Sequence, residues 1–242
     1  MGDADPAVIV SPHPDDAVLS AWHVLTRPGA QAVITVFAGV PGPEARPSPW
    51  DRLTGCDDPI ARAVERRRED KAALALAGCL PAHLDFVGAS HRDGRPVDGV
   101  ALREALKAAI VAVTSAAEVW IPAGIGGHPD HIAARDAALA VTAGMRRMLY
   151  ADLPYAARFG WPPWVAAGRP DGPLDVDGWW HAQLDGLGAG RPLVCRLDER
   201  ARAGKRAAIG RYRSQVAALA GGSADDFPDG PTWAFEVAWE IR

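Results

Sequence analysis

The fold is decided by the opening stretch of the chain, AVIV (residues 7–10) followed by SPHPDD (residues 11–16) and AVLSAWHVL (residues 17–25). An apolar run bounded by prolines is typical of a buried strand, and the segment after the turn favours a helix that begins near Asp15. A second β-branched run, AVITVF (residues 32–37), follows a Pro-Gly turn. Strand, helix and strand in this order predict the first unit of a parallel sheet.

The same alternation continues along the chain. We expect helices over residues 62–77, 100–113, 132–142 and 205–219, and strands over residues 83–87, 118–121, 148–151 and 233–241. Residues 39–59 contain five prolines and three glycines, which predicts a long loop of the kind that serves as a lid or a binding segment. The fold class that follows is α/β, a Rossmann-like, doubly wound, mostly parallel sheet with helices on both faces.

A single domain is expected over residues 1–242. The 242 residues, 48% of them hydrophobic, are enough for one large core, and neither a repeat nor a linker interrupts them. We place the core at about residues 7–152 and a C-terminal elaboration of its rim at about residues 153–242. In that elaboration Trp161, Trp164, Trp179 and Trp180 lie among prolines and glycines, which predicts an irregular wall.

Charge and composition argue against several classes of partner. A formal charge of -4 gives no footprint for nucleic acid and argues against an anionic membrane. The sequence contains no run of about 18 apolar residues, so no membrane-spanning helix is expected. Residues 1–6 lack the basic and apolar regions of a signal peptide, so a cytoplasmic location is expected. The three cysteines are far apart and predict neither a disulfide framework nor a CxxC pair. A homo-oligomer stays open as an alternative to a monomer.

The first cluster that carries chemistry is Ser11-Pro12-His13-Pro14-Asp15-Asp16, directly after the first strand. In an open parallel sheet, ligands gather beyond the carboxyl ends of the strands. Two adjacent carboxylates repel each other unless a positive group shares the space, and a divalent metal would do so. The alternative is that Asp15 or Asp16 merely caps the helix that follows.

The second cluster is Gly126-Gly127-His128-Pro129-Asp130-His131, which follows the strand expected at residues 118–121. Two histidines three residues apart around an aspartate can direct both rings and the carboxylate into one cavity. The four histidines outside the clusters are expected to be structural.

Together the clusters offer imidazoles and carboxylates from two loops. Three such protein ligands with one position left for water are the pattern of catalytic zinc, and iron(II) also suits two imidazoles and a carboxylate. Metal-assisted hydrolysis further needs a base for the attacking water and a group that stabilises the oxyanion and protonates the leaving amine. Asp15 and His128 fit these two needs.

Both motifs resemble the signature motifs of the PIG-L/LmbE-like zinc-dependent N-acetylglucosaminyl deacetylase family. This family includes enzymes of mycothiol and bacillithiol synthesis, mycothiol-conjugate amidases and deacetylases of glycosylated natural products. The similarity extends to RRRED (residues 66–70), which looks like the family's Arg/Glu-led helix, and to LDF (residues 84–86). It covers roughly residues 7–152.

The resemblance implies a role for each motif residue. His13, Asp16 and His131 would be the ligands of Zn2+, with Fe2+ as the competing metal. Asp15 would be the general base, and His128 would stabilise the oxyanion and help the amine to leave. Asp130 would hydrogen-bond His128 and set its tautomer.

Two positions outside these roles bear on the substrate. Among the three arginines at residues 66–68, Arg67 is expected to bind polar groups of the substrate, with a solvated helix face as the alternative. The family commonly has Glu after the paired aspartates, where this chain has Ala17. None of the roles assigned above falls on Ala17. The missing carboxylate therefore affects only the contacts that would support the metal ligands or bind the substrate.

The function implied is metal-dependent hydrolysis of the N-acetyl group of an N-acetylglucosamine-type sugar conjugate, a small molecule of secondary-metabolite (antibiotic) or thiol-cofactor biosynthesis. The 9 tryptophans offer platforms for a sugar ring or an apolar aglycone, and packing of the loops is the alternative. Alternative functions are a mycothiol S-conjugate amidase and a non-catalytic sugar- or metal-binding descendant. A metal-dependent phosphoesterase would call for more ligands than these motifs provide.

Overall fold

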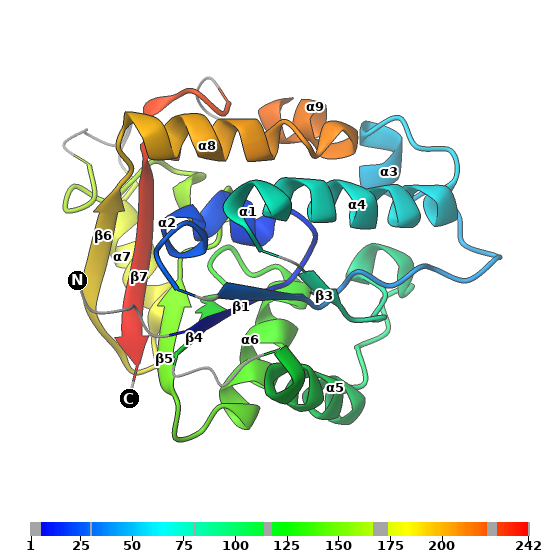
Figure 1. Cartoon of the computed structure of the whole chain (residues 1–242), viewed down its shortest axis with the longest axis horizontal. Helices are drawn as coiled ribbons and strands as arrows, with labels where there is room; N and C mark the ends of the chain where they lie inside the picture. Colours follow the sequence, from blue (N-terminus) through cyan, green and yellow to red (C-terminus); the bar gives the residue numbers. More distant parts are fainter. Residues whose placement is uncertain are drawn as a thin grey trace.

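The computed structural model describes residues 6–29, 31–79, 81–113, 118–166, 174–221 and 227–241. Within these ranges the strands form one seven-stranded sheet in the order β3-β2-β1-β4-β5-β7-β6, with helices on both faces (Figure 1). The expected α/β class, with a mostly parallel sheet, is confirmed. No helix in the described ranges is long and apolar enough to span a membrane.

Five parallel strands form the centre of the sheet. β1 (Ala7–Ser11) pairs with β2 (Gln31–Thr35) on one side and with β4 (Glu118–Pro122) on the other, while β3 (Pro81–His83) and β5 (Arg146–Tyr150) extend the sheet outward. Every residue of β1 and β4 is buried, as expected where helices cover both faces of a parallel sheet. The carboxyl ends of β1 and β4 therefore meet at one edge.

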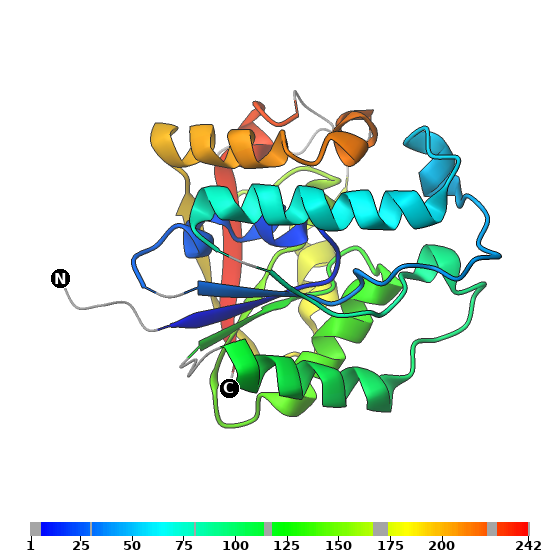
Figure 2. The same ribbon diagram turned by 45° about the vertical axis from the view of Figure 1, so that its right-hand side comes forward.

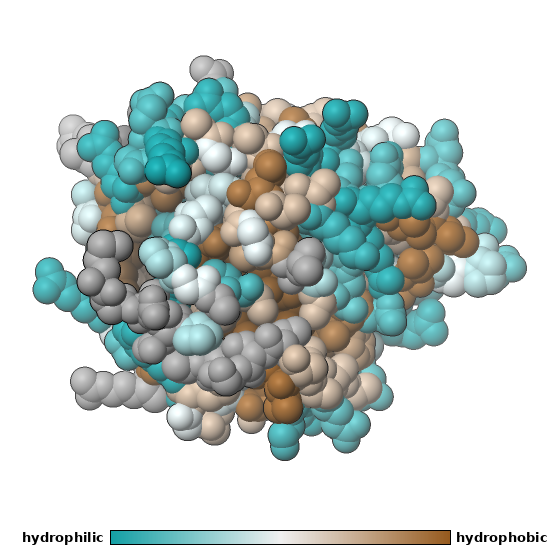
Figure 3. Space-filling view, in the orientation of Figure 1, coloured by the Kyte–Doolittle hydropathy of each residue, from teal (hydrophilic) through white to brown (hydrophobic). Residues whose placement is uncertain are grey.

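The helices form a layer on each side of this sheet. One layer contains α1 (Asp16–Ser20), α2 (Trp22–Leu25), α4 (Pro59–Leu74), α8 (Glu199–Ile209) and α9 (Arg213–Gly221). The other contains α5 (Gly99–Val113) and α6 (Pro129–Val141), and Figure 2 shows the sheet lying between α4 and α5. Hydrophilic side chains gather over α4 and over the beginning of α8 (Figure 3), because these helices bury only one side.

Helix boundaries differ from the sequence prediction for local reasons. α4 begins at Pro59 because the Asp58 side chain accepts hydrogen bonds from the first amides of the helix. The segment expected as one helix over residues 17–25 divides at Ala21. The amides of Trp22 and His23 donate to the Glu236 carboxylate at 3.0 and 2.9 Å, so a side chain from the end of the chain caps α2. The helix expected at residues 205–219 is likewise two helices, α8 and α9.

The long loop and the third strand also differ in detail. The predicted loop at residues 39–59 contains a short helix, α3 (Pro49–Leu53), which Ser48 and Asp51 close with a capping box. The strand expected at residues 83–87 is β3, which lies earlier and ends at His83. Single turns of 3-10 helix occur at Ala75–Ala77, Ala89–His91, Tyr155–Ala157 and Pro231–Ala234.

The prediction of an irregular wall in the C-terminal third is wrong in its main part. Trp179 and Trp180 lie on a helix, α7 (Val176–Leu184). β7 (Phe235–Ile241) pairs antiparallel with β5, and β6 (Ala189–Arg196) pairs antiparallel with β7, so this region extends the sheet. Trp180 is fully buried and its ring lies 5.6 Å from that of Trp239 on β7. Trp161 and Trp180 therefore fill the core, as in the packing alternative, whereas Trp179 is partly buried and Trp164 is 37% exposed.

Candidate active site

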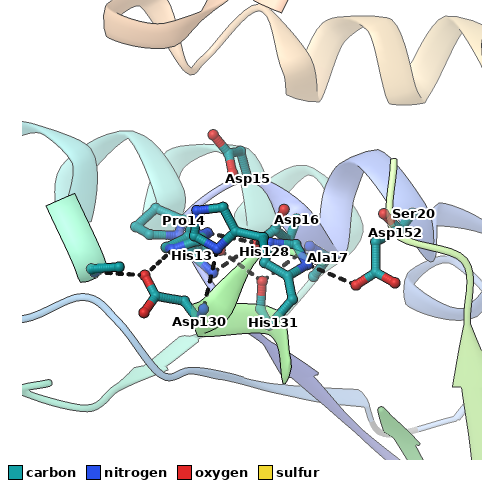
Figure 4. A network of polar contacts seen from close by, with 12 residues as sticks. His13, Pro14, Asp15, Asp16, Ala17, Ser20, His128, Asp130, His131 and Asp152 are labelled. Atoms are coloured by element: carbon teal, nitrogen blue, oxygen red, sulfur yellow. Dashed lines mark hydrogen bonds and ion pairs between the residues drawn. The ribbon is translucent and has the colours of Figure 1, made fainter. Parts of the chain in front are cut away.

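The two sequence clusters meet at the carboxyl edge of the sheet, in the loops that follow β1 and β4. They border a pocket with a volume of about 390 Å³. Its reactive end holds His13, Asp15, Asp16, His128 and Asp130, and Figure 4 shows the histidines lying between Asp130 on one side and Asp152 on the other. The expectation that the clusters lie together at this edge is met by the geometry.

The first loop is held in shape by Ser11. Its hydroxyl donates to the His13 carbonyl at 2.8 Å and accepts from the Ala17 amide at 3.0 Å. Ala17, which stands where the family has Glu, thus contributes its backbone N–H, and its methyl group is buried in the core. The contact that holds the loop does not depend on the side chain at this position.

Asp15 is not a helix cap. It precedes α1, but its side chain makes no capping hydrogen bond, and its φ of 109° is a conformation that costs a residue with a Cβ about 1–3 kcal/mol. Its carboxylate is directed instead toward Arg66, with Oδ2 at 3.3 Å from Nη2. Burial raises the pKa of Asp15 to about 7, against the opposing effect of Arg66. The strained turn thus presents a basic carboxylate to the pocket.

The histidines and Asp16 form a compact group of ligand atoms. One ring nitrogen from each of His13, His128 and His131 lies within 4.8 Å of the others. Asp16 Oδ2 lies 3.2 Å from His13 Nδ1 and 3.2 Å from His131 Nε2. His131 Nε2 is buried and makes no hydrogen bond within the described part of the chain, although it lies 3.2 Å from Asp16 Oδ2. A buried ring nitrogen without a partner, facing a carboxylate and other imidazoles, fits a divalent cation such as Zn2+ or Fe2+.

The charges within this group are strongly coupled. Burial alone would raise the pKa of Asp16, but His131 and His13 outweigh it and hold that pKa well below its usual range. Burial lowers the pKa of His128 to about 4, and the neighbouring His13 and His131 act in the same direction. At neutral pH the structure therefore pairs an ionised Asp16 with a neutral His128.

Each of the two histidines nearest Asp16 has its other ring nitrogen on a carboxylate. His13 Nε2 lies 2.9 Å from Asp130 Oδ2, and His131 Nδ1 lies 2.7 Å from Asp152 Oδ1. Metal-ligating histidines are commonly oriented by such a carboxylate. Asp152 was missed in the sequence, although a carboxylate directly after a neighbouring parallel strand, β5, is the signal that could have found it.

Asp130 contacts His128 differently from the expectation. Its backbone N–H, and not its carboxylate, donates to His128 Nδ1 at 3.2 Å, because His128 caps α6. In a neutral ring the proton is then on Nε2. The carboxylate of Asp130 lies on the other side, with His13. The expected side-chain contact is therefore corrected, while a neighbouring amide still sets the tautomer.

Arg67 is not directed into the pocket. Its guanidinium contacts the Ala38 carbonyl and the Asp85 carboxylate. Arg62 and Arg66 line the pocket instead, because residues four apart share one face of α4. The expected substrate contact by Arg67 is thus not supported by its position, and Arg66 is the arginine nearest to the reactive groups.

The remaining walls come from segments that carry no motif. Tyr155 packs its ring 5.2 Å from His131 and 5.8 Å from His128. At the far end Trp50 donates to Gln215 Oε1 at 2.7 Å, which joins the long loop to α9. The prediction that residues 39–59 form a binding segment therefore agrees with their place in the pocket wall.

A mostly parallel α/β sheet with imidazoles, carboxylates and a pocket at its carboxyl edge defines a class of proteins that bind a small molecule beyond the ends of the strands. Within this class the chain belongs to the PIG-L family, since the family model described as GlcNAc-PI de-N-acetylase matches residues 8–142. The resemblance of the two motifs is thereby confirmed.

Three relatives extend this assignment. The chain is 30% identical over 169 residues to 2'-N-acetylparomamine deacetylase of Streptomyces fradiae, a match that covers 62% of this chain and 58% of that protein. The structure of the A40926 pseudoaglycone deacetylase Dbv21 is similar with a TM-score of 0.74 and 31% identity, over 98% of this chain and 97% of that one. The zinc-inhibited form of the teicoplanin deacetylase Orf2 is similar with a TM-score of 0.75 and 28% identity, over 97% of each chain.

Proposed function

We propose that the protein is a metal-dependent N-deacetylase that hydrolyses the N-acetyl group of an N-acetylglucosamine-type sugar conjugate. The observation that carries the proposal is the buried His131 Nε2, which makes no hydrogen bond, faces Asp16 Oδ2 at 3.2 Å and lies beside His13 and His128. Membership of the PIG-L family and the deacetylase activity named for the three relatives support it.

His13, Asp16 and His131 would hold the metal, which we propose to be Zn2+ with Fe2+ as the alternative. When bound, such a cation supplies Lewis-acid polarisation of the amide carbonyl and of the attacking water. His13 lies in the loop after β1, Asp16 begins α1, and His131 lies in the first turn of α6, so the ends of β1 and β4 fix their positions. Their outer contacts with Asp130 and Asp152 keep the rings turned toward Asp16.

Asp15 takes the proton from the attacking water. Its raised pKa makes it a stronger base than an exposed aspartate, and Arg66 holds the carboxylate in place. The water oxygen then forms a bond to the acetyl carbon, and the carbonyl oxygen takes up the negative charge.

His128 stabilises that charge. Because its Nδ1 accepts from the Asp130 amide, its Nε2 carries the proton and can donate to the oxyanion. The tetrahedral species collapses by breaking the carbon–nitrogen bond. Asp15 returns the proton that it took from the water to the leaving nitrogen, which departs as the free amine, and the acetic acid left behind ionises to acetate.

We infer a substrate larger than a single sugar. Besides its reactive groups, the pocket wall contains the apolar side chains of Leu19, Trp50, Pro59, Ala218 and Leu219. An apolar wall of this kind suits an aglycone attached to the amino sugar. The named substrates of the relatives favour antibiotic biosynthesis over thiol-cofactor biosynthesis.

The test measures bound metal and acetate release together. The protein is loaded with one equivalent of Zn2+ or, without oxygen, Fe2+, and assayed with a panel of N-acetylglucosaminyl compounds that includes glycosylated aglycones. One equivalent is used because a structural neighbour is a zinc-inhibited form. Asp15→Asn is expected to lower kcat at least about 100-fold, as for loss of a general base. Asp136→Asn, which changes an exposed carboxylate of α6, is expected to leave kcat unchanged.

The other outcomes are distinct. Acetate release without any bound metal contradicts the proposed mechanism. Cleavage of a cysteinyl amide but not of the acetyl amide of the same sugar identifies a conjugate amidase. Metal binding with no hydrolysis of either amide identifies a non-catalytic descendant.

A further inference from the structure

We propose that Arg92 is a positioning residue of the metal site, which fixes the His13 ring by holding the Asp130 carboxylate. This inference rests on the proposed metal site. Arg92 belongs to neither sequence motif and lies in the turn after the 3-10 helix Ala89–His91. Its guanidinium is not in the pocket wall but behind it.

The Asp130 carboxylate is the link between Arg92 and His13. Asp130 is 1% exposed, and each of its carboxylate oxygens accepts at least one hydrogen bond. Oδ2 accepts from the Ala89 amide at 2.8 Å and lies 2.9 Å from His13 Nε2, while Oδ1 accepts from Arg92 Nη1 at 2.7 Å. A buried carboxylate with a guanidinium on one oxygen and a histidine on the other is fixed in orientation as well as in charge.

Arg92 is itself fixed by the protein. Its Nη1 also donates to the Val87 carbonyl at 2.8 Å, and its Nε donates to the Arg95 carbonyl at 3.1 Å. Its guanidinium carbon lies 5.2 Å above the ring of Phe37, and that ring lies 6.0 Å from His13. Stacking on an aromatic face and hydrogen bonds to two carbonyls leave the guanidinium little freedom.

This arrangement determines which nitrogen of His13 faces Asp16. With Nε2 directed to Asp130, Nδ1 is left 3.2 Å from Asp16 Oδ2, on the side of His131. Without Arg92 the buried Asp130 carboxylate loses its only cationic partner among the described residues other than His13 itself. It would then shift toward other donors, and the His13 ring would no longer be held in one orientation.

The experiment compares Zn2+ dissociation constants, measured against a competing chelator, for the full-length wild type and three variants. Arg92→Met removes the charge and all its hydrogen bonds while keeping an apolar contact with Phe37. Arg92→Lys keeps the charge without the planar fork. Arg95→Met is the matched control, because Arg95 is exposed and, within the described ranges, the hydrogen bonds of its side chain go to Asp93 and the Arg92 carbonyl.

We expect Arg92→Met to raise the dissociation constant for Zn2+ about 10- to 100-fold, the usual effect of removing a contact behind a metal ligand. Arg92→Lys should recover part of that loss, and Arg95→Met should bind as the wild type does. The absorption spectrum of the Co2+-loaded protein should change in Arg92→Met, which a merely structural role for Arg92 would not produce.

Equal Zn2+ affinity and an unchanged Co2+ spectrum in Arg92→Met would overturn this inference while leaving the proposed metal site intact. A wild type that binds neither ion would overturn the proposed metal site itself. If Arg92→Met does not fold, as judged by circular dichroism, Arg92→Gln gives the same decision, since it keeps an N–H donor but not the charge.

Discussion

Two histidine–carboxylate pairs flank the site, and they are held by different means. His131 and Asp152 are both completely buried, and the carboxylate has one further bond, from the Ile125 amide at 2.9 Å. His13 borders the pocket with 16% of its side chain exposed, and its carboxylate, Asp130, has the cation of Arg92 as well as an amide. The His131–Asp152 pair is thus part of the core, whereas the His13–Asp130 pair is part of a charged network at the pocket wall.

The difference indicates which residues should affect folding and which should affect only the site. A buried pair with no other cation depends on both partners being present, because removing one leaves an uncompensated charge in the core. A pair at the pocket wall with a second cation can lose its histidine and still keep the carboxylate satisfied. The two pairs can therefore be separated by experiments that record stability and metal binding together.

The largest effect is expected from removing the histidines. His131→Ala should lower the free energy of unfolding of the metal-free protein by about 3–5 kcal/mol, because Asp152 is left buried without its partner. His13→Ala should cost only about 1 kcal/mol, because Asp130 keeps Arg92 and the Ala89 amide. Both variants should lose Zn2+ binding. Urea denaturation of both metal-free variants checks this, and equal losses of stability would contradict the comparison.

The sequence identified three members of these pairs, His13, Asp130 and His131, but neither pairing, because Asp130 was expected to contact His128. The local pattern of strand, motif and helix located β1, β4 and the residues that meet beyond them, because that information is contained in short segments. Asp152 and Arg92 could not be assigned, since each gains its role only when a distant segment brings a histidine or a carboxylate to it.

The C-terminal third was hard to predict for another physical reason. β6 is an edge strand whose exposed and half-buried residues do not alternate, so it lacks the period of two that marks a strand. The tryptophans of α7 lie near glycines and prolines, yet Trp180 is buried against β7 by contacts that span the whole region. The periodicity of apolar residues does not predict a helix or strand where the burial of its side chains depends on partners far along the chain.

A third pair, remote from the pocket, serves as a reference for the first two. His23 Nδ1 lies 2.6 Å from Glu236 Oε2, and Lys205 Nζ donates to Glu236 Oε1 at 2.7 Å. Burial opposes ionisation of Glu236, but Lys205 and His23 outweigh it and lower the pKa of its carboxyl group to about 2. Glu236 is therefore as completely buried as Asp152, and like Asp130 it has a second cation beside its histidine.

The pH dependence of stability follows from the sign of that shift. The pKa of Glu236 is lower in the folded chain than its usual value of 4.5, so its contribution is complete above about pH 4.5 and is lost as the pH falls toward 2. The contribution is on the order of 3 kcal/mol. Glu236→Gln should abolish this part of the acid dependence in denaturation measured between pH 2 and 6. Glu240→Gln, which changes an exposed carboxylate of the same strand, should retain it.

The next effect concerns the carboxylates of the two site pairs. Asp152→Asn and Asp130→Asn should each weaken Zn2+ binding about 10- to 100-fold, because each ring loses the group that orients it. In a protein that already carries Asp130→Asn, adding Arg92→Met should leave Zn2+ affinity nearly unchanged, since the two residues act through one contact. In a protein that carries Asp152→Asn, adding Arg92→Met should still weaken Zn2+ binding. A double-mutant cycle on chelator-competition data measures this. Additive effects of Asp130→Asn and Arg92→Met would show that Arg92 acts by another route.

The smallest effect separates the packing of His131 from its charges. Gly126 and Gly127 both have positive φ, 92° and 75°, so an alanine at either position is strained by about 1–2 kcal/mol. A Cβ at Gly127 meets nothing within 4 Å, whereas a Cβ at Gly126 would lie 2.6 Å from the Cβ of Tyr155. Gly126→Ala should therefore push Tyr155 away from His131 and lower stability by about 1 kcal/mol more than Gly127→Ala does. Because Tyr155 contacts the proposed ligand His131 as well as His128, Zn2+ affinity should fall further in Gly126→Ala than in Gly127→Ala, and by less than in Asp152→Asn. Equal stability and affinity of the two alanine variants would mean that the Tyr155 ring does not support the buried pair.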